Sequence, residues 1–207
     1  GLKRASIIAQ EIREKIYKKT GLTASAGISA NKFIAKIASD YNKPNGQKTI
    51  KPQEIQSFVE NLEIKKFFGI GKKTAQIMYH LGIFTGLDLK KKSFEFLEEH
   101  FGNSAQHYYN ISRGISNSEV QPNRIPKSIA AERTFETNLT SEIFLQEKLK
   151  VISVELESRL KKRNISGKTV TLKIKYSDFT IQTRSETLTY FISNQDLIYD
   201  TAMRLLF

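Results

Sequence analysis

IKKFFGIGKKTAQIMYHLGI, residues 64–83, predicts a helix, a tight Gly-Ile-Gly turn and a second helix. Gly69 and Gly71 permit a turn whose successive backbone N–H groups point outward, and the second helix adds the positive end of its dipole. Donors and positive charge at the start of that helix come from Lys72, Lys73 and Thr74. These groups together are suited to hold one phosphate, and the alternative is an ordinary helical hairpin with a glycine turn.

The same hairpin resembles the helix-hairpin-helix, a motif that grips DNA backbones without reading their sequence. That motif usually has a proline before its Gly-hydrophobe-Gly, and Phe68 stands there instead. The composition favours the phosphate interpretation, since 33 Lys and Arg against 21 Asp and Glu give a net charge of +12 at pH 7. Such a charge attracts nucleic acid or an anionic membrane surface, and alone it does not choose between them.

Length and composition limit the class of protein. The chain has 207 residues, enough for one domain or two with a substantial core, and no stretch is long and apolar enough to span a membrane. The absence of cysteine excludes a disulfide framework and a thiolate metal site, which fits a cytoplasmic location. The chain begins with GLKRAS and ends with TAMRLLF, both within expected helices, so we expect it to be part of a longer protein.

Helix and strand patterns alternate before the hairpin. We expect helices over residues 2–19, 32–41 and 53–60, and strands over residues 22–29 and 47–50. Asn31 is the expected N-cap of the second helix. Phe33, Ile34 and Ile37 would form the apolar face of that helix.

Three lysines accompany this second helix: Lys32, Lys36 and Lys43. Helical spacing predicts that they lie near one edge, and the Pro44-Asn45-Gly46 turn would hold Lys43 just beyond the helix end. A lysine held by a stiff turn can reach a diphosphate or triphosphate as a point charge. From the residues alone, a solvated face is favoured over a triphosphate site.

After the hairpin, residues 88–102 and 104–114 predict two more short helices. Residues 114–126 have no periodicity and contain two prolines, which indicates a linker. Beyond it, we expect a strand over 128–135, an amphipathic helix over 141–162, strands over 169–176 and 179–191, and a C-terminal helix. The order β-α-β-β-α lacks one strand of a β-α-β-β-α-β, ferredoxin-like fold.

The predicted strand over residues 169–176 alternates cleanly and places Lys173 and Lys175 on its outward face. We expect the sheet to bury its apolar face on the two helices and to expose its Lys, Arg and Thr face. An RNA-binding sheet would instead need exposed aromatic side chains for stacking. Because Tyr176 and Phe179 are predicted to point inward, that alternative is disfavoured.

Several separated motifs resemble the Y-family DNA polymerases of the DNA polymerase IV type. They are TASAGISANKFIAKIASDYNKPNGQKTI, FFGIGKKTAQIMYHLGI, RGI, KSIAAERTF and YSDFTIQTRS, in the order which that family shows. The resemblance covers nearly the whole chain and implies an α+β fold of four parts. These would be the C-terminal part of the palm (1–62), a helix-hairpin-helix thumb (63–113), a linker (114–126) and a little finger without its last strand (127–207).

The resemblance also implies an activity and partners. The parent protein would be a nucleotidyltransferase that adds deoxynucleotides to a primer opposite damaged template DNA, with Mg²⁺ as cofactor. Its partners would be primer–template DNA, a deoxynucleoside triphosphate and, through a segment outside this chain, a sliding clamp. In that family the Lys of Lys-Pro-Asn-Gly contacts the triphosphate, which carries over to Lys43. The little-finger residues that would face DNA are Lys127, Ser128, Arg133, Lys173, Lys175, Thr183 and Arg184.

Catalytic residues are not expected within this chain. Two-metal nucleotidyl transfer needs clustered carboxylates, and the resemblance implies that they precede the first helix. The aspartates here are scattered over different elements, Glu98 and Glu99 diverge on one helix, and the histidines show no ligand spacing. We therefore expect no catalytic or metal-binding residue in residues 1–207, and no polymerisation by this chain alone. The alternative function is a non-catalytic, sequence-independent DNA-binding or repair scaffold.

Overall fold

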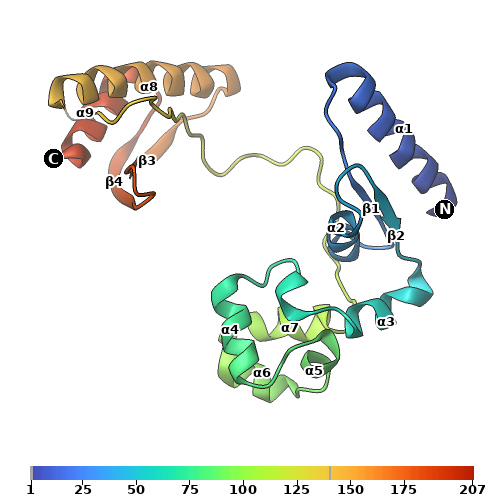
Figure 1. The fold of residues 1–207 in the computed structure, drawn as a ribbon. Coiled ribbons are helices and arrows are strands. Elements are labelled where there is room, and N and C mark those ends of the chain that lie inside the picture. Colours follow the sequence, from blue (N-terminus) through green and yellow to red (C-terminus); the bar gives the residue numbers. More distant parts are fainter. Residues whose placement is uncertain (1, 140) are drawn as a thin grey trace. The chain divides into compact units, whose positions relative to one another are not determined.

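The computed structural model describes residues 2–139 and 141–207, which fall into two compact units (Figure 1). The first unit extends to Pro122 and the second begins at Asn123. This boundary lies inside residues 114–126, where the structure has no helix or strand. Each unit has its own set of internal contacts.

The first unit begins with two helices and two short parallel strands. These are helix α1 (Leu2–Thr20), strand β1 (Ala26–Ile28), helix α2 (Lys32–Tyr41) and strand β2 (Gln47–Thr49). Both helices contact both strands. An added Cβ at Gly27 would lie 1.9 Å from the Ala35 carbonyl oxygen, so only glycine lets α2 pack this closely on β1.

Helix α2 begins where the sequence predicts. The Asn31 side chain accepts a hydrogen bond from the Ile34 N–H at 3.0 Å, as expected of an N-cap. Phe33, Ile34 and Ile37 are buried, which confirms the predicted apolar face. This face attaches the helix to the core of the unit and leaves its lysines on the surface.

The strand predicted over residues 22–29 is formed only at its end, as β1. The preceding backbone is engaged elsewhere, because the Ala24 carbonyl accepts a hydrogen bond from the Arg13 side chain of α1 at 2.9 Å. A backbone group satisfied by a side chain does not need a neighbouring strand.

Short helices make up the rest of the first unit. They are α3 (Ile55–Glu60), α4 (Lys72–His80), α5 (Gly86–Lys90), α6 (Phe94–Phe101) and α7 (Ala105–Ile111), with 3-10 turns at Pro52–Glu54, Ile64–Lys66 and Gly102–Ser104. The stretch over residues 88–102, predicted as one helix, is divided between α5 and α6. Ser93 causes the division, because its side chain accepts from the Phe96 N–H at 3.2 Å and starts a new helix.

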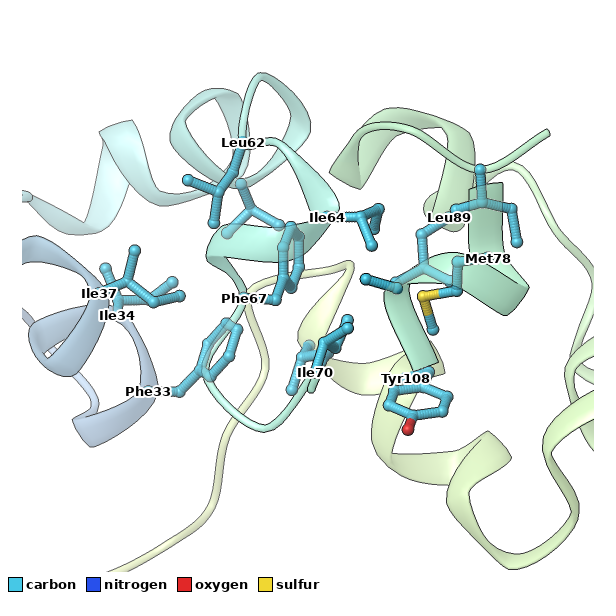
Figure 2. Close-up of a cluster of buried hydrophobic side chains, with 14 of the residues drawn as sticks. Phe33, Ile34, Ile37, Leu62, Ile64, Phe67, Ile70, Met78, Leu89 and Tyr108 are labelled. Atoms are coloured by element: carbon cyan, nitrogen blue, oxygen red, sulfur yellow. The ribbon is translucent and has the colours of Figure 1, made fainter. Parts of the chain in front are cut away.

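One hydrophobic core joins α2 to the short helices (Figure 2). Phe33 of α2 and Phe67 of the hairpin pack ring against ring, with centroids 6.0 Å apart. The cluster also includes Ile34, Ile37, Leu62, Ile64, Ile70, Met78, Leu89 and Tyr108. The hairpin turn is therefore held at a fixed position relative to α2.

The second unit contains helix α8 (Glu142–Arg163), strands β3 (Gly167–Lys175) and β4 (Ile181–Ile192), and helix α9 (Gln195–Leu206). The two strands form an antiparallel hairpin in which Lys173 lies opposite Thr183 and Leu172 lies opposite Arg184. Val170, Leu172 and Ile174 are less exposed than the residues between them, so the predicted alternation is confirmed.

The strand predicted over residues 128–135 is not formed. Side chains connect this segment to its neighbours, since Glu132 pairs with Lys173 of β3 at 3.2 Å and Arg133 pairs with Glu155 of α8. The Ala130 carbonyl accepts a hydrogen bond from the Arg159 side chain. Its backbone therefore follows α8 and β3 without entering the sheet.

Helix α8 has the predicted position but not a single apolar face. Ile143, Val151 and Val154 are about half exposed or more on a helix that also packs against α9. No helix in the described part of the chain is both long and apolar enough to cross a membrane.

Candidate nucleic-acid interface

Lys43 follows α2 at the start of the Pro44-Asn45-Gly46 turn, and its side chain is 58% exposed. Its Nζ atom lies 2.5 Å from Oδ1 of Asp40, while Nζ of Lys36 lies 3.2 Å from Oδ2 of the same carboxylate. The hydrogen bond from Lys43 is the main cause that lowers the pKa of Asp40, burial opposes it, and Lys36 adds to it. Two of the three lysines are therefore held together by an acid that the sequence interpretation did not consider.

Lys32 is not part of this ion-pair cluster. Its Nζ donates to the Glu119 carbonyl at 2.8 Å and to the Ser118 hydroxyl at 3.2 Å. Lys32 and Lys36 are four residues apart on one helix, as predicted, but the Lys32 ammonium is bonded to the segment that follows α7 and does not share the Asp40 carboxylate. A helical pattern predicts where a residue lies on the helix, but the end of a long side chain can bond to a partner away from that position.

The hairpin turn has the backbone geometry that its glycines predict. Gly69 has φ +93°, which favours glycine, and Gly71 is the N-cap of α4 without a side-chain cap. A Cβ added at Gly71 would meet nothing within 4 Å, so an external group can approach the backbone there. Lys72 and Lys73 are exposed beside this approach, and Thr74 is partly buried.

Lys36 links the hairpin turn to the Lys43 site. Its Nζ lies 5.9 Å from the centroid of the exposed Phe68 ring and 3.2 Å from the Asp40 carboxylate. Phe68 is thus a cation–π partner at the position where the motif usually has proline. The glycine turn and the Lys43 turn therefore lie on neighbouring surfaces of one unit.

The outward face of the β3–β4 sheet carries hydroxyls and lysines. The Thr171 and Ser185 hydroxyls are 2.9 Å apart, as are those of Thr169 and Thr187. Three of the predicted residues are exposed on this face: Lys173, Lys175 and Thr183. Lys175 also lies over the Phe179 ring, 4.4 Å from its centroid.

Arg184 does not lie on that face, so this part of the prediction is wrong. It is opposite Leu172, and neighbouring residues of one strand point to opposite sides, which separates it from Thr183. Its Nη1 donates to the Leu205 carbonyl at 3.0 Å and the Leu206 carbonyl at 3.3 Å, at the end of α9. A guanidinium there satisfies helix carbonyls and complements the negative end of the dipole.

The remaining predicted residues precede α8. Lys127 and Ser128 are exposed in a segment without helix or strand. Arg133 pairs with Glu155, which also pairs with Arg159. Because Arg133 has a carboxylate partner within its own unit, as Lys173 has in Glu132, both offer less free charge than Lys175.

Two aromatic residues at the β3–β4 turn are placed differently from the prediction. Tyr176 is 49% exposed and Phe179 is 74% exposed, although both were expected to point inward. The alternation of β3 ends at Lys175, and Phe179 adopts a positive φ of 66° in the turn. The Tyr176 hydroxyl donates to the Gln182 side chain at 2.9 Å instead of entering the core.

Acidic and histidine side chains do not gather in the described ranges. No group of three among His, Asp and Glu could hold a metal ion within residues 2–139 and 141–207. Asp88, for example, accepts hydrogen bonds from the Phe84 and Thr85 N–H groups at the start of α5. The acids named here serve helix ends and ion pairs.

Comparison with known proteins places this architecture in one family. Residues 2–40 match the impB/mucB/samB family, residues 52–83 match the HHH motif of the IMS family, and residues 126–207 match the impB/mucB/samB C-terminal domain. A solved Y-family DNA polymerase chimera is 26% identical, with a TM-score of 0.80 over 100% of this chain and 60% of that chain. The combination of partial palm, helix-hairpin-helix thumb and little finger is therefore confirmed as the fold.

Curated relatives agree with this assignment. DNA polymerase IV 2 of Agrobacterium fabrum is 48% identical over 100% of this chain, and DNA polymerase IV of Leptospira interrogans is 47% identical over 97% of it. The chain spans 58% and 56% of the lengths of these two relatives. It belongs to the impB/mucB/samB family of Y-family DNA polymerases.

Proposed function

We propose that the protein carrying this chain is a template-directed translesion DNA polymerase, and that this chain holds the duplex backbone and the incoming triphosphate. The observation that carries the proposal is the juxtaposition, in one unit, of the open glycine turn at Gly71 with the Lys36–Asp40–Lys43 cluster. Relatives named DNA polymerase IV, similar over the whole chain, support the same conclusion. The parts would be a palm portion (1–62), a thumb (63–113), a linker (114–126) and a little finger (127–207).

Each part has a separate task in this proposal. The thumb turn offers backbone N–H groups, Lys72, Lys73 and Thr74 to one phosphate of the duplex. The outward sheet face offers Lys173, Lys175 and Thr183 to further phosphates, with Lys127 and Ser128 before it. Backbone N–H groups, lysines and hydroxyls are the usual donors to phosphate oxygens, which carry no sequence information, so we expect binding to be independent of sequence.

Lys43 would exchange its carboxylate partner for phosphate oxygens. In the free chain Asp40 neutralises part of its charge, and a triphosphate brings several negative oxygens to the same ammonium. Because the side chain is more than half exposed, the exchange needs only a change of rotamer.

Nucleotidyl transfer would also need divalent metal, for which we propose Mg²⁺. Two metal ions held by carboxylates align the primer 3′ oxygen with the α-phosphate and stabilise the leaving group. We propose that the carboxylates lie in the part of the relatives which this chain does not span. The same applies to a sliding-clamp contact, and the location would be the cytoplasm.

Primer extension tests the proposal directly. The complete gene product should extend a primer with deoxynucleotides and Mg²⁺, while the 207-residue chain alone should bind primer–template without extending it. If neither extends a primer while both bind duplex, the non-catalytic scaffold is the correct function. Extension by the 207-residue chain would contradict the assignment of the carboxylates outside it.

The exposed aromatics favour a second candidate function, single-strand binding by base stacking. Phe179, 74% exposed and next to Lys175, has the character of a stacking side chain. Comparing Phe179→Ala for single-stranded and duplex oligonucleotides separates the two functions. A loss of about 1–3 kcal/mol in binding free energy for single strands, with none for duplexes, would support stacking. If the variant and the unaltered protein bind single strands equally well, duplex binding is the only function supported.

A further inference from the structure

The turn that carries Lys43 is fastened to helix α1 by one arginine. Arg13 Nη2 donates to both the carbonyl and the Oδ1 atom of Asn45, the latter at 2.9 Å. Its Nη1 donates to Gln47 Oε1 at 3.3 Å, and its Nε donates to the Ala24 carbonyl at 2.9 Å. A single guanidinium thus connects α1, the loop before β1, the turn after α2 and the start of β2.

Further contacts hold the far end of the same turn. Gln47 Nε2 donates to the Ser6 hydroxyl at 2.9 Å and to the Ser6 carbonyl at 3.1 Å, again on α1. The Asn42 side chain donates to the Gln47 carbonyl at 2.8 Å across the turn. A Cβ at Gly46 would lie 2.1 Å from the Asn42 carbonyl oxygen, so the turn is closed tightly.

Lys43 lies between these fastened points, while its own side chain is bonded only to Asp40 among the contacts of the described residues. The turn therefore fixes the position of the Lys43 backbone and the direction in which its side chain leaves that backbone. Ordering a flexible loop on binding costs free energy in addition to immobilising the side chain, and a turn that is already held in place avoids that part of the cost. Arg13 itself is occupied by protein acceptors and is not directed at the Lys43 ammonium.

We propose that Arg13 is a positioning residue for the triphosphate-binding lysine: it fixes the 43–46 turn so that Lys43 is presented to the nucleotide. This inference rests on the proposed function, because it assumes that Lys43 binds triphosphate. Arg13 is partly buried and its side chain donates to Asn45, Gln47 and Ala24, so we expect its effect on Lys43 to pass through the turn that contains Asn45.

The test uses the complete gene product in single-nucleotide primer extension, with KM and kcat for the deoxynucleotide measured separately. Arg13→Gln should raise KM about threefold to tenfold with little change in kcat, the signature of weakened nucleotide binding. Lys15→Gln, which removes a positive charge from an exposed position of the same helix, is the matched control and should leave KM unchanged. Asn45→Gly tolerates the positive φ and removes the Oδ1 acceptor while keeping the carbonyl acceptor, so it should raise KM less than Arg13→Gln does.

A double variant separates positioning from a general structural role. If Arg13 acts through Lys43, Arg13→Gln should add nothing to KM once Lys43→Ala is present. The inference is overturned if Arg13→Gln raises KM equally with and without Lys43→Ala. It is also overturned if Arg13→Gln and Asn45→Gly leave KM unchanged while Lys43→Ala raises it. Both outcomes leave the proposed function intact. If Lys43→Ala itself does not change KM, the triphosphate assignment fails and the inference fails with it. Should Arg13→Gln not fold, Asn45→Gly alone decides the question.

Discussion

In the proposed function, the glycine turn of the first unit and the β3–β4 sheet of the second would both bind DNA phosphates, but by different means. The turn offers backbone N–H groups around Gly71, and its chemistry depends on φ angles and on the absence of a side chain. The sheet offers side chains, and its chemistry depends on which residues the register turns outward. DNA binding through the turn should therefore be weakened by a side chain added at its glycines. DNA binding through the sheet should be weakened by substitutions that remove or reverse the charge of its lysines.

The largest effect is expected on the sheet. Lys173→Glu with Lys175→Glu should weaken duplex binding more than about tenfold for any sequence, because two phosphate contacts become repulsions. The slope of log affinity against log salt should also fall in magnitude by about 1.8. Fluorescence anisotropy with two unrelated duplexes checks this, and a loss limited to one duplex would contradict backbone gripping.

The next effect is expected at the turn. Gly71→Ala places a methyl group where a phosphate would approach, without meeting any atom of the chain within 4 Å. Duplex affinity should fall about threefold to tenfold, as for one lost hydrogen bond. The melting temperature should fall by only a few degrees, because alanine is a poorer N-cap than glycine. Gly167→Ala, at another glycine where an added Cβ meets nothing within 4 Å and the backbone is not left-handed, is the control for affinity. Undiminished binding by Gly71→Ala would mean that the hairpin is structural.

Arg184 separates the contribution of the outward sheet face from that of the sheet's total charge, because it is a charged residue of β4 that does not lie on the outward face. Arg184→Gln should leave the salt slope of duplex binding unchanged and lower the free energy of unfolding by about 1 kcal/mol, through the lost α9 carbonyl contacts. Lys175→Gln should instead reduce the salt slope of duplex binding and leave the free energy of unfolding unchanged. Urea unfolding together with salt titration distinguishes them, and a slope change for Arg184→Gln would show that it reaches phosphate.

The smallest effect is expected at Asp40. Asp40→Asn frees Lys43 and should lower the KM of the complete gene product for deoxynucleotide about twofold to threefold, as expected for an exposed ion pair. Since pairing lowers the pKa of Asp40 below its ordinary 3.8, the stabilisation is present above that value and is lost as the pH falls through the lowered pKa. A raised KM would show that Asp40 helps to hold the nucleotide.

Local patterns predicted most of the fold. The Asn31 cap, the α2 face, the glycine turn and the β3 alternation each depend on neighbours in sequence, and all are present. The segment over residues 128–135 was predicted wrongly because its own residues do not encode whether its backbone pairs with a sheet, and here side-chain contacts hold it beside β3 and α8 instead.

The candidate sites were less predictable, since they depend on pairings distant in sequence or on register. The contact of Arg13 with Asn45 joins residues 32 positions apart, and the bond of Lys32 to Glu119 joins residues 87 positions apart. The side of the sheet on which Arg184 lies depends on the strand register, and a shift of one residue in that register moves a side chain to the other side. Asp40, by contrast, could have been found, because it lies four residues after Lys36 and three before Lys43.

Duplex binding by the 207-residue chain across a range of salt tests the central claim most directly. We expect log affinity to fall linearly with log salt, by about 0.9 for each phosphate contacted, and to the same extent for unrelated sequences. Affinity that is independent of salt, or confined to one sequence, would contradict a protein that grips the DNA backbone through its turn and its sheet.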